Sequence, residues 1–134
     1  MRDLSLYCGI KFREKGDGWD GCDCWGLIRL FFKTEFNLDL DDCRTLYFGI
    51  RDIDSIRTIA EEERKKWREI KGERKVGDVV EIPLAPRNFH VGVIAAPGMI
   101  LHCEDGGFSQ TVPITSQRIA RRIKATWRHF SLEP

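Results

Sequence analysis

The first half of the chain carries a helical pattern of hydrophobic residues. Between Trp25 and Phe36 these residues cover more than one face, which predicts a helix that is surrounded by protein. Asp23 is the expected N-cap, because an Asp side chain accepts hydrogen bonds from the first N–H groups of a helix. Asn37 is the expected stop, since Asn tolerates the left-handed conformation that is common at helix C-termini. A short opening helix is expected within residues 1–10.

A second helix is predicted over residues 54–70, because a row of residues there recurs at helical spacing. The row consists of Ile56, Ile59, Ala60, Glu63 and Trp67. Segments 11–21 and 39–52 lack such a period and are expected to be loops. Glycine and aspartate are frequent in the first of these two loops, which leads directly into the central helix.

After Gly72 the pattern changes to the period of two that is typical of β-strands. Strands are predicted over residues 76–84, 89–95, 99–103, 108–112 and 123–130, with a short helix over residues 114–122. Helices followed by an antiparallel sheet form an α+β layout. With 134 residues, the chain is expected to form a single domain over residues 1–134.

Composition and charge narrow the classes of function. Hydrophobic residues make up 42% of the chain and charged residues 32%, which is usual for an ordered globular protein. The net charge of +1 creates no overall field that would attract nucleic acid or an anionic membrane. The basic runs at residues 64–66 and 118–124 are interpreted as solvated helix faces. No apolar segment approaches the roughly 20 residues that span a bilayer, so neither nucleic acid nor membrane is an expected partner.

The N-terminal residues and the cysteines bear on the cellular compartment. The first residues lack the basic, apolar and small-residue regions of a signal peptide. We therefore expect the protein to be made and folded in a cytoplasm. The chain has five cysteines, and an odd number without a signal peptide indicates free thiols rather than a disulfide framework.

Cys24 is the strongest candidate for a reactive group. It falls in the first turn of the predicted central helix, where the helix dipole and free backbone N–H groups favour negative charge. Both effects favour the thiolate, which is the nucleophilic form of cysteine. The alternative is a buried structural thiol, since free cysteine is among the most buried residue types.

A cysteine nucleophile needs an imidazole as its base and a further polar group that orients this imidazole. Of the three histidines, His90 opens one predicted strand and His102 lies near the end of the next. A hairpin centred near Ala96 would place the two opposite each other on one sheet face. Packing the helix of Cys24 against that face would bring all three together. His129 fits no such pattern and is expected at the surface.

Two other interpretations stay open from the residues alone. His90 and His102 could be hydrogen-bonded sheet residues without a chemical role. Together with Cys22, Cys24 and Cys103 they could also suggest a zinc site. However, the spacing between Cys22 and Cys24 is shorter than in structural zinc sites, and no second cysteine pair of the zinc-binding kind exists in the sequence.

Four short motifs resemble, in their order along the chain, those of the NlpC/P60 cysteine peptidases. They are Asp23-Cys24-Trp25-Gly26-Leu27, Gly77-Asp78-Val79-Val80, His90-Val91-Gly92-Val93 and Gly98-Met99-Ile100-Leu101-His102. The Trp after the cysteine, with Arg29 and Leu30 following, is similar to the branch encoded by tailed phages and related gene-transfer particles. The resemblance covers nearly the whole chain, from about Cys8 to Trp127.

The resemblance implies a papain-like NlpC/P60 fold in which Cys24 is the nucleophile, His90 the general base and acid, and His102 the orienting residue. It implies hydrolysis of peptide bonds in bacterial peptidoglycan, commonly between D-glutamate and a diamino acid, without a cofactor or a metal ion. In the phage branch, such a protein would belong to the tail tip of the virion and contact other tail-tip proteins. A virion component would need no signal peptide.

One position departs from the family pattern. Many members carry a Tyr upstream of the cysteine, and the matching residue here is Phe12, which has no hydroxyl. Tyr7 is nearby but at the wrong place in the motif. The oxyanion would then depend on backbone N–H groups, in a site whose wall is expected to include Phe12, Asp23 and Trp25. Loss of an oxyanion donor costs about a hundredfold to a thousandfold in turnover.

Two rival functions accompany the peptidase hypothesis. Phe12 favours a structural tail-tip or tail-assembly protein that keeps the papain-like fold with little or no activity. Amide or acyl transfer on another substrate is the third hypothesis, because the same catalytic residues would support it.

Overall fold

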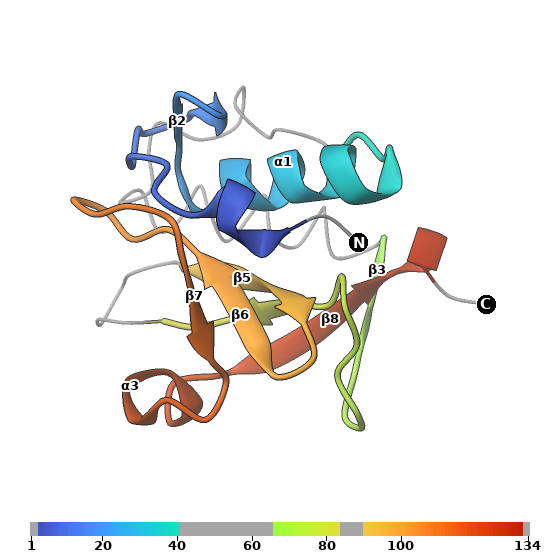
Figure 1. Cartoon of the computed structure of the whole chain (residues 1–134). Helices are drawn as coiled ribbons and strands as arrows, with labels where there is room; N and C mark the ends of the chain where they lie inside the picture. Colours follow the sequence, from blue (N-terminus) through green and yellow to red (C-terminus); the bar gives the residue numbers. More distant parts are fainter. Residues whose placement is uncertain (1–2, 41–65, 84–89, 133–134) are drawn as a thin grey trace.

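A six-stranded antiparallel sheet forms the centre of the molecule, with helix α1 (Cys24–Phe36) on one face and helix α3 (Gln117–Ala120) on the other (Figure 1). The computed structural model describes residues 3–40, 66–83 and 90–132. In sheet order, the strands are β3 (Trp67–Glu69), β8 (Ala125–His129), β4 (Val79–Glu81), β5 (Val91–Ala96), β6 (Met99–His102) and β7 (Gln110–Pro113). The strand nearest the C-terminus, β8, therefore lies between two earlier strands.

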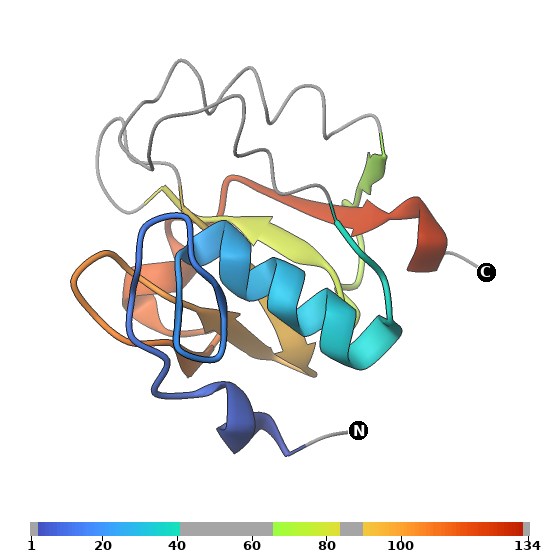
Figure 2. The same cartoon turned by 90° about the horizontal axis from the view of Figure 1, so that it is seen from above.

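Shorter elements frame the sheet and α1. They are the 3-10 helices η1 (Leu4–Tyr7) and η2 (Phe130–Leu132) and the two-stranded sheet of β1 (Asp17–Gly18) and β2 (Gly21–Cys22). Seen from above, α1 lies over the large sheet (Figure 2). Helix first and antiparallel sheet afterwards is the predicted α+β layout, which is thereby confirmed. Among the described residues, no helix combines the length and apolar character needed to cross a bilayer.

The two ends of α1 are fixed as the sequence predicts. The Asp23 carboxylate accepts a hydrogen bond from the N–H of Gly26 at 2.7 Å, and its second oxygen accepts one from the N–H of Lys15 at 2.9 Å. Asn37 adopts the left-handed conformation with φ 52° and donates its N–H to the Lys33 carbonyl. Asp23 therefore caps the helix and also holds the preceding loop.

The sheet separates two hydrophobic clusters. The larger cluster lies between α1 and the sheet and includes Leu27, Ile28, Phe31, Val91, Val93, Ala95 and Leu101. The smaller cluster lies on the α3 face and includes Val80, Ile82, Ile94, Ile100 and Ile119. Successive residues of β5 thus point to opposite faces, as the predicted alternation requires.

The helix predicted over residues 54–70 is wrong at its C-terminal end. Residues 54–65 lie outside the described ranges, and residues Trp67–Glu69 form β3, which pairs with β8. Trp67 is buried and packs edge-on against Phe32, whereas Arg68 faces solvent. Trp67 happens to continue the helical spacing of the preceding hydrophobic residues. The sequence pattern therefore does not reveal that buried and exposed residues alternate in this strand.

His129 is buried, contrary to the expectation that it lies at the surface. Its side chain meets Trp67 edge to face, with ring centroids 4.9 Å apart. Its Nδ1 accepts a hydrogen bond from the Ser131 N–H at 3.1 Å. His129 pairs with Trp67 across β8 and β3. Because β3 and β8 are distant in the sequence, this pairing, which buries His129, could not be expected from the neighbours of His129 along the chain.

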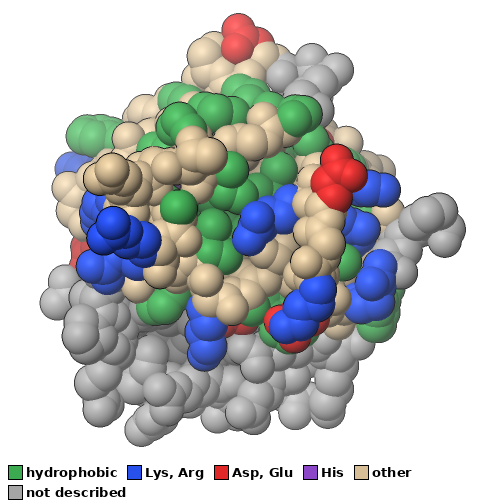
Figure 3. All heavy atoms as spheres, turned by 90° about the horizontal axis from the view of Figure 1, so that it is seen from below, with side chains coloured by type: hydrophobic (Ala, Val, Ile, Leu, Met, Phe, Trp, Pro, Cys, Tyr) green, Lys and Arg blue, Asp and Glu red, His purple; other side chains and the backbone are tan. Residues whose placement is uncertain are grey.

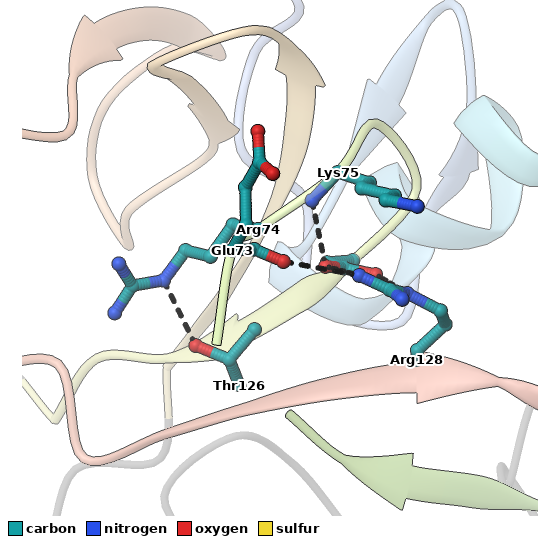
Figure 4. Close-up of polar contacts among 6 residues, drawn as sticks. Glu73, Arg74, Lys75, Thr126 and Arg128 are labelled. Atoms are coloured by element: carbon teal, nitrogen blue, oxygen red, sulfur yellow. Dashed lines mark hydrogen bonds and ion pairs between the residues drawn. The ribbon is translucent and has the colours of Figure 1, made fainter. Parts of the chain in front are cut away.

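A buried ion pair ties β8 to the turn before β4 (Figure 4). Arg128 donates from Nε and Nη2 to the two carboxylate oxygens of Asp78, at 2.7 and 2.8 Å. The Asp78 side chain is 1% exposed and that of Arg128 is 12% exposed. Asp78 also accepts the Lys75 N–H at 2.8 Å, while Arg128 Nη2 reaches the Glu73 carbonyl at 3.3 Å. This fork-like geometry locks the turn against β8.

We expect Asp78→Ala to lower the free energy of unfolding by about 3–5 kcal/mol, because it leaves the buried guanidinium of Arg128 without its carboxylate. Urea denaturation measures the change. As the matched control, Asp20→Ala removes the exposed pair with Arg13 and should cost about 1 kcal/mol or less. Equal losses in the two variants would contradict the structural importance of the buried pair.

Candidate active site

Cys24 is the first residue of α1 and is 1% exposed. Burial, followed by the negative charge of Asp23, raises the pKa of the Cys24 thiol well above its ordinary value. Hydrogen bonding from the backbone N–H groups of Val91 and Trp25 acts in the opposite direction and is outweighed. Burial therefore opposes the effect that the helix terminus is expected to have on Cys24, and its raised pKa favours the neutral thiol.

His90 and His102 form a direct hydrogen bond. His90 Nε2 lies 2.8 Å from His102 Nδ1, and both side chains are buried. The ring planes are inclined by 72°. The sequence-based expectation that the two histidines meet in a hairpin is confirmed by this contact.

The register that brings the histidines together differs from the predicted one. Val93 pairs with Leu101, and the pairing shifts at a bulge between Ile94 and Ala96. Extending this register places His102 opposite Gly92 rather than opposite His90. A Cβ atom at Gly92 would lie 3.3 Å from His102 Cβ and 2.6 Å from a side-chain carbon of Ile100. The bare backbone of Gly92 thus leaves the space in which His102 leans toward His90.

The face of the sheet that carries the histidines is not the face that α1 covers. His90 and His102 have the parity of Ile94 and Ile100, which belong to the cluster on the α3 side. The expected packing of α1 against the histidine face is therefore wrong. Cys24 belongs to the cluster on the α1 side and meets the sheet at the first residue of β5, directly after His90. Within the described ranges, no hydrogen bond joins the Cys24 thiol to the His90 ring.

Both imidazoles are held in the neutral form. Burial, with a contribution from His102, lowers the pKa of His90 to about 3. Burial also lowers the pKa of His102. If His90 Nδ1 is to accept the Cys24 proton, its Nε2 must carry hydrogen and donate to His102. His102 Nε2 then carries hydrogen as well, and among the described residues this buried atom has no hydrogen-bond partner.

The remaining wall residues proposed from the sequence have structural contacts. Phe12 is half-buried, and its backbone N–H donates to the Gly107 carbonyl at 2.9 Å. Phe12 also forms an isolated parallel β-bridge with Cys22. Trp25 is half-buried and meets Trp67 edge to face at 6.5 Å. Both carboxylate oxygens of Asp23 accept backbone N–H groups, so this residue supports the site as a cap.

The tyrosine nearest to Phe12 in sequence does not replace the missing hydroxyl. Tyr7 is fully buried and its hydroxyl donates to Glu35, in the last turn of α1. Cys24 lies at the opposite end of the same helix. Tyr7 therefore does not supply an oxyanion donor at Cys24, and the use of backbone N–H groups for this purpose stays a prediction.

Two further thiols lie beside the site. Cys22 and Cys103 are buried, and the neighbouring Cys103 thiol, followed by burial, raises the pKa of Cys22. Cys103 Sγ also lies 3.6 Å from the Cys22 carbonyl oxygen. The cysteines in the described ranges are free. In the same ranges no three His, Cys, Asp or Glu side chains are placed to hold one metal ion, which does not favour the zinc interpretation.

Sequence reasoning missed an ion pair next to the histidines. Arg118 Nη1 and Nη2 donate to the two oxygens of Glu104 at 2.7 and 2.6 Å. The charges of both residues act on His90 and on His102. Arg118 was interpreted as part of a solvated basic helix face, although Glu104 follows His102 by only two positions in the sequence.

We expect the free energy of unfolding to fall as the pH decreases from about 6.5 to 5. The pKa of His90 is about 3 in the fold, and burial also lowers the pKa values of His102 and His129 below 6.5. The unfolded chain therefore binds more protons in this window, and each fully effective group contributes about 1.4 kcal/mol per pH unit. Urea denaturation across this window measures the slope.

His90→Asn should make this slope smaller, because it removes the imidazole that most strongly resists protonation. Carboxylates titrate mainly below this window, so they contribute little to the comparison. A free energy of unfolding that stays constant from pH 6.5 to 5 would contradict the burial of neutral imidazoles.

Comparison with known proteins places this geometry in context. The sequence matches the NlpC/P60 family over residues 9–128. No curated protein sequence matches it significantly. The structure is similar to the NlpC/p60 domain of peptidoglycan hydrolase SagA, with TM-score 0.59 and 15% identity, covering 92% of this chain and 90% of that one.

Two longer solved chains contain a similar part. A protein similar to lipoprotein, of the NLP/P60 family from Staphylococcus aureus subsp. aureus Mu50, gives TM-score 0.60 and 16% identity, covering 94% of this chain and 38% of that one. NlpC1 from Trichomonas vaginalis gives TM-score 0.57 and 16% identity, covering 95% and 41%. At these identities the likeness concerns the fold. Because the family match extends over most of its length and the architecture agrees, the chain belongs to the NlpC/P60 family and has the papain-like fold of that family.

Proposed function

We propose that this protein is a cysteine peptidase that hydrolyses peptide bonds of bacterial peptidoglycan, with Cys24, His90 and His102 as its catalytic residues. The observation that carries the proposal is the buried His90–His102 hydrogen bond, because His90 directly precedes Val91, whose backbone N–H bonds to the Cys24 thiol. The similarity to a domain of a peptidoglycan hydrolase supports this choice of substrate class.

The proposed reaction follows from the orientation of His90. Its Nε2 is bonded to His102, so Nδ1 is the ring atom that accepts the Cys24 proton. The thiolate then attacks the amide carbon of the substrate, and His90 returns the proton to the leaving amine. Water, deprotonated by His90, hydrolyses the thioester and regenerates the thiol. Backbone N–H groups at the start of α1 stabilise the oxyanion.

The proposed location is the tail tip of a phage or related particle, where the enzyme would open the wall locally and contact other tail-tip proteins. The support is the motif version with Trp25 after the cysteine and Arg29-Leu30 following it. Detection of the protein by mass spectrometry in purified particles from the source organism tests this location. Its absence from such particles, together with presence in the cell, would refute it.

A structural tail-tip role is the second candidate function. It is favoured by the buried, protonated Cys24 thiol, by the lack of a hydrogen bond to His90, and by Phe12 in place of Tyr. This candidate predicts a stable complex with tail proteins and no turnover of wall peptides. The two candidates differ in one measurement, which is cleavage of muropeptides by the purified protein.

We expect Cys24→Ala to abolish muropeptide cleavage and His90→Ala to lower kcat/KM by about a hundredfold to ten-thousandfold, because the nucleophile and its base are removed. Liquid chromatography of the peptide products measures the rates. The matched control is Cys8→Ala, which removes an exposed thiol. Circular dichroism establishes that the variants remain folded. Unchanged cleavage by Cys24→Ala would refute the proposal.

We expect iodoacetamide to alkylate Cys24 much more slowly than Cys8 at neutral pH in the free protein. Cys24 is buried and its pKa is raised, whereas Cys8 is exposed. Mass spectrometry of the alkylated peptides gives the rate for each thiol. Faster reaction of Cys24 than of Cys8 below about pH 8 would mean that a thiolate–imidazolium pair already exists in the resting site.

A further inference from the structure

Two buried cysteines that the proposed mechanism does not use lie next to each other. Cys22 is the last residue of β2 and Cys103 directly follows β6, and the two residues are 0% and 1% exposed. Cys103 Sγ lies 3.6 Å from the Cys22 carbonyl oxygen and 3.8 Å from the Ile10 carbonyl oxygen. Both cysteines belong to the hydrophobic cluster on the α1 side of the sheet. The fold thus brings together two thiols that are 81 positions apart in the sequence.

The two thiols are matched with each other rather than with Cys24. Cys103 has the largest effect on the pKa of Cys22, which it raises, and Cys22 has the largest effect on the pKa of Cys103, which it lowers. The Cys24 thiol is instead bonded to the backbone N–H groups of Val91 and Trp25. Cys103 influences the pKa of Cys24 less than burial, Asp23 and these N–H groups do.

The surroundings of the two thiols favour an uncharged product. Figure 3 looks onto the α3 face, where Lys and Arg side chains lie around a hydrophobic middle. Cys22 and Cys103 lie on the other side of the sheet, where burial and the Asp23 carboxylate raise the pKa of both thiols. A thiolate at either position therefore depends on the neighbouring thiol, whereas a disulfide carries no charge that burial would penalise.

We propose that Cys22 and Cys103 form an intramolecular disulfide when the protein meets a peroxide. This bond joins the residue before the Asp23 cap to the residue after His102, so it ties the start of α1 to the end of β6. The pairing does not rest on the proposed function, because it needs only the positions of the two thiols. A protein that acts on a bacterial wall, as proposed above, works outside the reducing cytoplasm, where such a bond persists.

The reaction balances with hydrogen peroxide as the oxidant. The Cys103 thiolate, whose pKa is the lower of the two, attacks one peroxide oxygen, and the other oxygen leaves as hydroxide. The Cys22 thiolate then attacks the sulfur of the resulting sulfenic acid, which forms the S–S bond and releases a second hydroxide. The two thiol protons convert both hydroxides to water. The thiols thus lose two electrons and two protons, and one peroxide becomes two waters.

Mass spectrometry of the full chain tests the pairing. The reduced protein is treated with hydrogen peroxide, the remaining thiols are alkylated after unfolding, and the peptides are mapped without reduction. We expect one pair of peptides linked through Cys22 and Cys103, which dithiothreitol separates. The inference is overturned if Cys24, Cys8 or Cys43 forms the disulfide instead, or if oxidised cysteines appear without any disulfide.

Thermal unfolding shows whether the bond suits the native geometry. A disulfide between residues this distant in the sequence restricts the unfolded chain, so oxidation should raise Tm by about 5–15 °C. Circular dichroism measures Tm before oxidation, after oxidation and after reduction with dithiothreitol, which should remove the rise. A Tm that is unchanged or lower in the oxidised protein overturns the inference, because a strained bond would not form between thiols already in place.

Matched variants assign the rise in Tm to these two thiols. In Cys22→Ser and in Cys103→Ser, oxidation should leave Tm unchanged, whereas Cys8→Ser removes an exposed thiol and should keep the full rise. A rise that survives in both buried variants overturns the inference. If a buried variant does not fold, the linked peptide and the reversible rise in the wild type decide. These measurements require no cleavage of muropeptides, so failure of the proposed function does not affect them.

Discussion

The geometry of the site depends on the carboxylate of Asp23. One oxygen caps α1 through Gly26 and the other holds the preceding loop through Lys15, so the position at which the helix begins is fixed from both sides. Cys24 follows directly and is presented to the start of β5. The same carboxylate raises the pKa of the thiol that it positions. The residue that places the nucleophile therefore also opposes its ionisation.

Burial has the largest effect on the charges at rest, because it raises the pKa of the Cys24 thiol and lowers the pKa of both imidazoles. The thiol and the two imidazoles are all buried, and none of these groups gains from being charged alone. Proton transfer from Cys24 to His90 creates two charges at once, and its free energy depends on what surrounds the new imidazolium. On the α3 side, Glu104 raises the pKa of His90 and Arg118 lowers it. The charges that act on Cys24 and those that act on His90 thus lie on opposite faces of one sheet.

Much of the framework follows from local patterns in the sequence. The limits of α1 are visible in Asp23 and Asn37, because caps are decided by residues next to the helix end. The alternation in β5 likewise separates the two faces of the sheet. The contact between His90 and His102 could also be anticipated, since both have the same parity in neighbouring strands of a hairpin.

The features that escaped prediction depend on long-range contacts. Trp67 continues a helical row locally, yet its pairing with His129 makes it part of a strand and buries the histidine. The hairpin register depends on a bulge near Ala96, and no residue type in this part of the sequence indicates a bulge. The ion pair of Glu104 with Arg118 joins two exposed segments, and charge alone gives no sign of which partners meet. The roles of Cys24, His90 and His102 stay predictions.

The central place of β8 has a consequence for how the protein acquires its architecture during synthesis. Strand β8 covers residues 125–129 but lies between β3 and β4 in the sheet. Both neighbours leave the ribosome earlier and must wait with unpaired edges until this strand emerges. Completing the sheet therefore requires contacts between distant residues, which slow folding. A nascent chain lacking β8 can already pair β4, β5, β6 and β7 around the hairpin of the two histidines, whereas β3 has no partner strand until β8 emerges.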